Sequence, residues 1–285
     1  MIKKIFVLLL LFCFSSLNNC FAFEHGGWHI HQESKVIGAS DAKGINGEVG
    51  LKDFSFSLNK ESFLYQDWPV NTGFSFNRYF INNSSSFYLP DTLESKSINL
   101  GAYLPLPYAN NQDLFLKINF IPIWNTAEEH DFNSDVFRFN SVYFLGYRSS
   151  DDFILAVGII SQPEYDNPLI PFVGVFYRMD EKISFNFLSP NPSINYSLTK
   201  NIDAFLEFGF LGDEFEIAGG EYQGDILSVS NYFMGIGTET KITKDIKLKL
   251  SFGEVFWQEY EYLKRQTYIS VADSGYFSCR LKGRF

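Results

Sequence analysis

Cysteine is scarce in this sequence, which has three such residues in a chain of 285. Cys13 and Cys20 lie in the first 22 residues, and only Cys279 follows them. A chain from which those 22 residues are removed has one cysteine and forms no internal disulfide. The stability of the folded protein then has to come from hydrogen bonds and packing.

Positive charge is also in deficit. The chain has 23 basic and 33 acidic residues, a net charge of −10. Loss of Lys3 and Lys4 with the N-terminal segment leaves 21 basic and 33 acidic residues, a net charge of −12. Binding to nucleic acid requires clustered positive charge that neutralises phosphates. This balance argues against nucleic acid as a partner.

Long hydrophobic runs are missing from the rest of the chain. After the N-terminal segment, no stretch reaches the roughly 18 consecutive apolar residues of a membrane-spanning helix. The mean hydropathy is only −0.07. Helical membrane spans are therefore excluded for the mature chain, and any route across a bilayer has to use strands.

The first 22 residues have the pattern of a secretory signal peptide. Lys3 and Lys4 provide a positive start, Ile5–Phe14 is a ten-residue apolar stretch, and Cys20–Ala22 offers small residues for cleavage. A lipid-attachment site at Cys20 is an alternative, but Leu17–Asn19 lacks the small residue that such a site needs. We predict a signal peptide over residues 1–22 and one domain over residues 23–285.

Aromatic residues are abundant, at 18% of the chain with 32 Phe and 16 Tyr. They recur in runs of about ten residues with period-two hydrophobicity, which is typical of strands between two unlike environments. Thirteen such runs are Gly47–Asn59, Asn71–Phe80, Ser95–Leu104, Leu114–Trp124, Val136–Tyr147, Phe153–Gln162, Leu169–Tyr177, Lys182–Leu188, Ser193–Thr199, Ile202–Leu211, Asp225–Thr238, Asp245–Trp257 and Ser274–Phe285. Thirteen is an odd number, whereas single-chain bacterial β-barrels have an even number of strands. A weaker first strand at Trp28–Ala39 would bring the total to fourteen, which we favour over twelve.

The connections between these runs alternate in length. Short polar turns are expected at Arg148–Asp152, Arg178–Glu181, Thr199–Asn201 and Thr243–Asp245. Longer and often acidic loops are expected at Asn82–Glu94, Asn125–Asp135, Gln162–Pro168, Gly212–Gly224 and Gln258–Asp273. Short turns at one end and long loops at the other are typical of an all-β, transmembrane antiparallel up-and-down barrel. A soluble exported β-sandwich remains an alternative, although Greek-key connections would not need this alternation.

The terminal strand resembles that of bacterial outer-membrane β-barrel proteins. Its alternate residues Phe277, Leu281 and Phe285 are apolar, and the chain ends on an aromatic residue. The resemblance implies that these three residues form the signal read by the barrel-assembly machinery, and that the protein lies in the outer membrane. The segment Phe187–Leu198, reading FLSPNPSINYSL, also resembles a poorly characterised family of outer-membrane barrels known only as a domain of unknown function. That likeness implies a barrel and no activity.

Polar residues on alternate strand positions are the candidates for the barrel interior. They are Lys117, Asn119, Asp203, Glu207, Lys247, Lys249, Arg280, Lys282 and Arg284. The last two strands are expected to be neighbours, so their lysines and arginines form a basic stripe toward the periplasmic half. Two interpretations stay open. The charges create a field that favours polar or anionic solutes in a pore, or they pair and fill a narrow lumen.

Three functions remain possible from the sequence. The leading prediction is a non-enzymatic pore or structural barrel for small polar solutes, with no cofactor, no metal and no catalytic residues. The first alternative is an adhesin-type barrel that binds through its acidic loops, which could bridge to lipopolysaccharide phosphates through divalent cations. The second is a lipid-active enzyme using His130, which lies beside Glu128, Glu129 and Asp131.

Removing Phe285 tests the predicted assembly signal. The truncated protein is expected to reach the outer membrane in smaller amounts, because the terminal aromatic is part of the signal. The measurement is outer-membrane fractionation with unboiled and boiled samples on a gel, where a folded barrel runs faster unboiled. Equal amounts of the heat-modifiable form with and without Phe285 would contradict the assignment.

Overall fold

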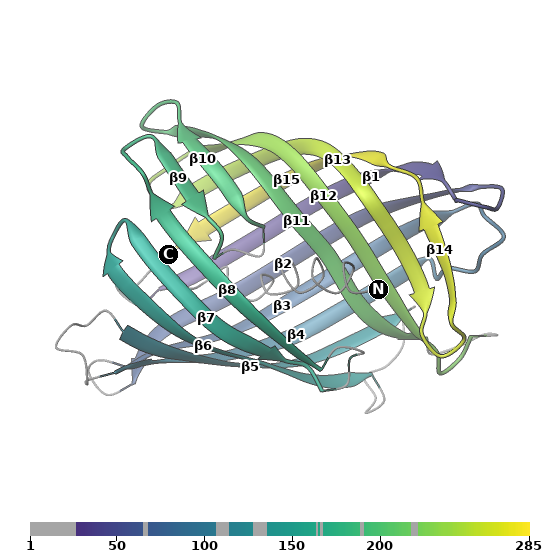
Figure 1. Ribbon diagram of the computed structural model, residues 1–285, viewed down its shortest axis with the longest axis horizontal. Coiled ribbons are helices and arrows are strands. Elements are labelled where there is room, and N and C mark those ends of the chain that lie inside the picture. Colours follow the sequence, from purple (N-terminus) through teal and green to yellow (C-terminus); the bar gives the residue numbers. More distant parts are fainter. Residues whose placement is uncertain are drawn as a thin grey trace.

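The computed structural model describes residues 27–64, 68–106, 114–127, 136–163, 165, 168–188, 191–217 and 222–285. The strands in these ranges form one antiparallel wall that closes on itself (Figure 1). Their bounds are β1 Trp28–Asp41, β2 Glu48–Leu64, β3 Trp68–Asn83, β4 Thr92–Pro105, β5 Leu114–Ala127, β6 Phe137–Ser150, β7 Phe153–Ser161, β8 Leu169–Arg178, β9 Ile183–Asn186, β10 Ser193–Ser197, β11 Ile202–Ile217, β12 Ile226–Lys241, β13 Ile246–Tyr262, β14 Thr267–Val271 and β15 Ser274–Arg284. No helix in these ranges is long and apolar enough to cross a membrane.

The predicted number of fourteen barrel strands is confirmed. β14 and β15 both pair with β13 and are separated only by Ala272 and Asp273, so together they form one barrel strand. The first strand, β1, closes the barrel against β15 from His29↔Arg284 to Ile37↔Tyr276. This places both ends of the described chain side by side, as an even strand number requires.

Side-chain oxygens hold the short turns. The hydroxyl of Thr199 accepts hydrogen bonds from the backbone amides of Asn201 and Ile202 at 3.2 and 3.1 Å. Thr243 does the same for the amides of residues 245 and 246. In the β8–β9 turn the carboxylate of Asp180 accepts from two amides, and these bonds lower the pKa of that exposed carboxyl. Such local caps explain why two or three polar residues suffice to reverse the chain at this end.

The outer face of the wall is apolar and ringed by aromatic residues. Exposed aromatics near the short turns are Trp28, Tyr147, Tyr177, Tyr196 and Phe285. Exposed aromatics toward the long loops are Phe80, Phe137, Phe139, Phe256 and Trp257. Between them lie exposed aliphatic residues such as Ile98, Leu155 and Ile236. An apolar band between two aromatic girdles is the surface that a transmembrane barrel presents to lipid.

Strand length is uneven around the barrel. β9 has four residues and β10 has five, whereas β11, β12 and β13 have sixteen or seventeen. At the long-loop end, Glu216 and Ile217 of β11 pair in parallel with Thr126 and Ala127 of β5. This contact bypasses β6–β10, so fewer strands enclose the long-loop end than the short-turn end. Figure 1 shows the short β9–β10 hairpin at the upper left and β14 at the right.

The long-loop end is filled by an apolar core. Fully buried side chains that point inward there include Phe215, Phe233, Tyr260 and Tyr262. Rings also pack in the loops, where Tyr222 stacks on Tyr262 with centroids 4.5 Å apart. The interior is therefore packed at the long-loop end.

Two expected loops contain more structure than the sequence indicated. The predicted loop Gly212–Gly224 begins too early, because β11 continues to Ile217 and pairs with β12 up to Glu216↔Ile226. The predicted loop Gln258–Asp273 contains the end of β13 and the whole of β14. Asp213 and Glu214 are consequently not solvated loop acids. Glu214 forms an ion pair of 2.9 Å with the buried Arg138.

A close approach between strands requires glycine at position 253. A Cβ added to Gly253 would lie 2.1 Å from the backbone oxygen of Met234, whereas one added to Gly275 meets nothing nearer than 3.9 Å. Gly253→Ala is expected to lower the free energy of unfolding by about 1–3 kcal/mol, since backbone cannot yield as a flexible side chain does. Gly275→Ala is the matched control. The measurement is denaturant unfolding of the folded barrel in detergent, and equal midpoints for the two variants would contradict the packing described.

Candidate functional site

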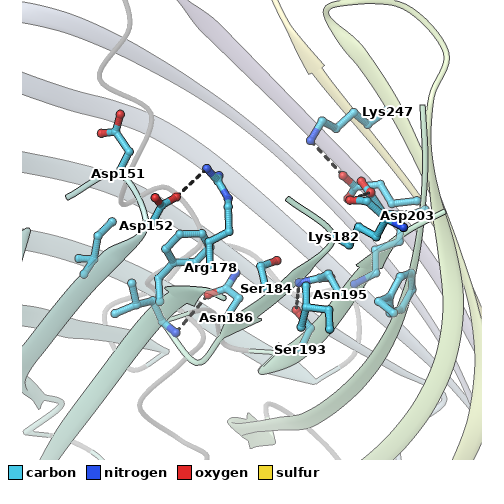
Figure 2. Close-up of a pocket in the computed structure, with 18 of the residues that line it drawn as sticks. Asp151, Asp152, Arg178, Lys182, Ser184, Asn186, Ser193, Asn195, Asp203 and Lys247 are labelled. Atoms are coloured by element: carbon cyan, nitrogen blue, oxygen red, sulfur yellow. Dashed lines mark hydrogen bonds and ion pairs between the residues drawn. The ribbon is translucent and has the colours of Figure 1, made fainter. Parts of the chain in front are cut away.

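A polar cavity of about 1300 Å³ opens at the short-turn end of the barrel. It is bounded by the β6–β7 and β8–β9 turns and by the inner faces of β9–β13 and β15. Figure 2 shows side chains from both sides converging on this space, with Arg178 and Asp152 facing Lys247 and Asp203 across it. We call this cavity the vestibule.

Four cations form a basic wall on one side of the vestibule. Lys247 and Lys249 lie on β13, and Arg280 and Lys282 lie on β15. The strand register places Lys247 opposite Lys282 and Lys249 opposite Arg280. The expectation that the last two long strands are neighbours is therefore correct, and these four residues line one cavity.

Three of the four cations have a carboxylate partner. Lys247 Nζ lies 3.0 Å from Glu239 Oε1, and Lys249 Nζ lies 2.6 Å from Glu207 Oε2. The guanidinium of Arg280 donates from Nε and Nη2 to the carboxylate of Glu33 at 2.8 and 2.9 Å. These bonds offset the repulsion within the wall and the cost of burying Glu207 and Arg280, which are almost fully enclosed.

Lys282 differs from the other members of the basic wall. It forms no hydrogen bond or ion pair with any residue in the described ranges, and it faces Lys247 across the strand pair. Two positive charges on directly paired strand positions repel one another and together attract an anion. Lys282 is therefore a candidate for attracting an anion into the vestibule.

The opposite rim is built from turn residues that pair among themselves. Arg178 Nη1 lies 3.0 Å from Asp152 Oδ1, and Arg148 forms an ion pair with Asp151. Figure 2 shows Asp151, Asp152 and Arg178 grouped at this rim. The charges of these two ion pairs cancel, whereas Lys282 in the basic wall has no ion-pair partner in the described part of the chain.

The remaining predicted interior residues occupy different places. Asp203 lines the vestibule and accepts a hydrogen bond of 2.6 Å from Ser197 Oγ. Lys117 and Asn119 are buried in β5 away from the vestibule, and Lys117 Nζ lies 4.9 Å from the ring centroid of Tyr103. Arg284 is half-buried opposite His29 in the closing strand pair and does not line the cavity.

The three residues of the expected assembly signal lie on the outer face. Phe277, Leu281 and Phe285 are 51%, 40% and 67% exposed. Cys279 is on the same alternate positions and is half-buried. The outer position of these apolar side chains is compatible with lipid contact, while recognition by an assembly machinery stays a prediction.

Two acidic partners of the basic wall were not singled out from the sequence. Glu33 lies on β1, whose alternation is weak, and Glu239 lies near the end of β12. A signal existed for Glu33, since Glu33 and Lys35 occupy alternate positions of the strand that closes the barrel. Without the register of β1 against β15, nothing in the sequence pairs Glu33 with Arg280.

The histidines are only partly described. His130, with the acids beside it, and His25 lie outside the described residues, so the enzymatic alternative is not tested. His29 and His31 lie on β1 with their Nε2 atoms 3.3 Å from Glu61 and 3.8 Å from Glu33. Within the described ranges, no group of three potential ligands is arranged to hold a metal ion.

Comparisons with known proteins identify one matching family. A family model described as "Domain of unknown function (DUF6268)" matches residues 27–277. A sequence comparison with curated proteins finds no match.

Several solved structures are similar to this chain at low sequence identity. An outer-membrane channel from Pseudomonas putida F1 is 11% identical, with a TM-score of 0.46 and coverage of 91% of this chain and 95% of that one. The P. putida toluene transporter TodX is 9% identical, with a TM-score of 0.44 and coverage of 95% and 92%. The NanC porin is 6% identical, with a TM-score of 0.42 and coverage of 90% and 100%.

Breaking the Glu33–Arg280 pair is expected to destabilise the barrel strongly. Glu33→Ala leaves the buried guanidinium without its two-point partner, which for a buried pair typically costs about 3–5 kcal/mol of unfolding free energy. The double variant Glu33→Leu/Arg280→Met is expected to recover most of that loss, because it removes both charges. Denaturant unfolding in detergent measures both, and a single variant as stable as wild type would contradict the role assigned to the pair.

Proposed function

The chain belongs to the family described as a domain of unknown function (DUF6268), and from its geometry we propose that it is an outer-membrane pore for small polar solutes. Solutes enter the vestibule from the periplasmic, short-turn end. The observation that carries this proposal is a cavity of about 1300 Å³ with a basic wall inside a closed barrel. The barrel is non-enzymatic in this proposal and uses no cofactor.

The outer surface supports the membrane location. An apolar band between two aromatic girdles buries itself in hydrocarbon, and a closed antiparallel wall leaves no strand edge to lipid. Both ends of the described chain lie beside the short turns, which is the periplasmic side of such barrels. Phe277, Leu281 and Phe285 remain our proposed contact with the barrel-assembly machinery.

The electrostatics of the vestibule favour anionic over cationic solutes. Lys247 and Lys282 face each other on its wall, and Lys282 has no ion pair within the described ranges. A positively charged wall in a narrow cavity raises the local concentration of anions and repels cations. We infer that small anionic solutes are the preferred cargo.

The packed core at the long-loop end keeps this pore closed at rest. Phe215, Phe233 and Tyr260 fill the interior there, and passage to the outside requires that part to rearrange. We therefore expect conduction in brief openings, with the pore shut between them. Closure at rest also prevents the leakage that a permanently open pore would cause.

A surface-binding barrel is the second candidate, and one observation favours it. The half-buried rings of Tyr88 and Tyr222 stack at 5.1 Å at the long-loop end, so two adjacent aromatic side chains are partly accessible there. Aromatic stacks of this kind suit a binding surface. Loop replacement would abolish binding in that case and leave the vestibule unchanged.

Planar-bilayer recording tests the pore. Purified, heat-modifiable protein is expected to show discrete openings, with a reversal potential in a salt gradient that indicates anion preference. Lys247→Gln/Lys282→Gln is expected to reduce that preference severalfold, because it removes two charges from the basic wall. Lys244→Gln, in the adjacent turn and outside the cavity lining, is the matched control.

Two results would contradict the proposal. One is the absence of any conductance from correctly folded protein over many insertions. The other is a reversal potential that is the same in wild type and in the double variant, since the basic wall would then have no effect on ions.

A further inference from the structure

Three cations face outward from the wall formed by β2, β3 and β4. They are Lys52, Arg78 and Lys96, one on each strand. The residues next to them in sequence, such as Leu51 and Tyr79, are buried inside the barrel, so alternation directs the cations to the outer, lipid-facing surface. We call these three residues with Glu94 the outer cation patch.

Glu94 links two of the cations. Its Oε1 atom lies 3.1 Å from Arg78 Nε, and its Oε2 atom lies 3.0 Å from Lys96 Nζ. The carboxylate is 10% exposed, whereas the side chains of Arg78 and Lys96 are 27% and 28% exposed. Glu94 therefore holds the two cations side by side while leaving part of each accessible from the lipid side. Three cations and one carboxylate give the patch a formal excess of two positive charges.

The depth of the patch follows from the strand register. Lys96 lies opposite Trp124 on β5, and Lys52 lies opposite Phe80 on β3. The guanidinium of Arg78 lies 5.3 Å from the ring of Phe80. Phe80 belongs to the aromatic girdle toward the long loops, and such girdles lie at the level of the lipid head groups. The cations are consequently at head-group depth in the leaflet on the long-loop side.

The charge of the outer wall differs on the opposite side of β1. There Glu254 on β13 and Asp273 beside β15 are exposed toward the long loops, and so are Lys264 and Arg265 in the turn between β13 and β14. Arg78 and Lys96 differ from those cations because they lie within the wall on neighbouring strands and share one carboxylate.

We propose that the outer cation patch binds the phosphate groups of a phosphorylated lipid in the outer leaflet, with the chemistry of lipid A. Arginine and lysine bind phosphate oxygens by charge-assisted hydrogen bonds, and the planar guanidinium presents two parallel donors. The aromatic and aliphatic side chains below the patch contact the acyl chains. The proposal rests on the membrane orientation proposed above and is independent of conduction.

Lipid binding by the folded, full-length mature protein tests this site. The probes are diphosphorylated lipid A and the same lipid with its phosphates removed, measured by native mass spectrometry from detergent. Wild type is expected to bind the phosphorylated form at least tenfold more tightly. Arg78→Gln/Lys96→Gln is expected to lose that preference.

Two further variants separate phosphate binding from a purely structural ion cluster. Lys60 lies on β2, the strand that carries Lys52, but at the opposite, short-turn end of its outer face beside Trp28. Lys60→Gln is therefore expected to leave lipid binding unchanged. Glu94→Gln removes the competing carboxylate and is expected to retain or strengthen binding. A structural cluster alone predicts the reverse, namely damage from Glu94→Gln without any dependence on lipid phosphate.

Two results would overturn the site. One is that wild type binds the two lipids equally well. The other is that Arg78→Gln/Lys96→Gln keeps the wild-type preference for the phosphorylated lipid. Conductance and anion preference of the double variant should match wild type, because the patch is on the outer wall. Loss of phosphate binding with normal conductance supports the site, and failure of conductance in every protein would count against the pore alone.

Discussion

A chain that crosses a bilayer as strands has to hydrogen-bond every backbone amide and carbonyl to another strand, because hydrocarbon offers no partner. In this protein the requirement is met by closing β1 against β15, where Trp28 and Phe285 exchange two backbone hydrogen bonds of 2.8 and 2.9 Å. Closure of the barrel determines which side chains of each strand point inward. It therefore also determines which charged residues lie in the interior and which lie on the outer surface. The vestibule, the packed long-loop end and the outer cation patch all depend on that one register.

The interior charges show how a barrel can be both stable and charged. Arg280 and Lys249 lie opposite each other, yet each is bonded to a carboxylate from a different strand, Glu33 on β1 and Glu207 on β11. The sequence left open whether the charges fill the lumen or line a pore, and the structure shows paired charges in the wall beside a cavity at the short-turn end. Paired charges support the wall at its deeper level, and Lys282 remains available at the cavity.

Much of the architecture could be predicted from the sequence because a period-two pattern is a local property. Strand existence, strand number and the position of short turns depend on neighbouring residues, and these predictions were correct. The charge partners could not be predicted, because Glu33 and Arg280 are 247 positions apart and meet only through barrel closure. The extension of β11 past Gly212 was also missed, since its acids resemble a solvated loop until Arg138 and β5 are placed beside them.

The central claim is a barrel open toward the periplasm and closed toward the outside. Cysteine labelling tests it most directly, in a Cys279→Ser background that removes the one free cysteine of the described residues. Lys282→Cys reports on the vestibule and Asp91→Cys on an exposed position beside the long loop before β4. With a thiol reagent that cannot cross the outer membrane, Asp91→Cys should react in intact cells and Lys282→Cys only after the cells are opened. Equal labelling of both positions in intact cells would contradict the account.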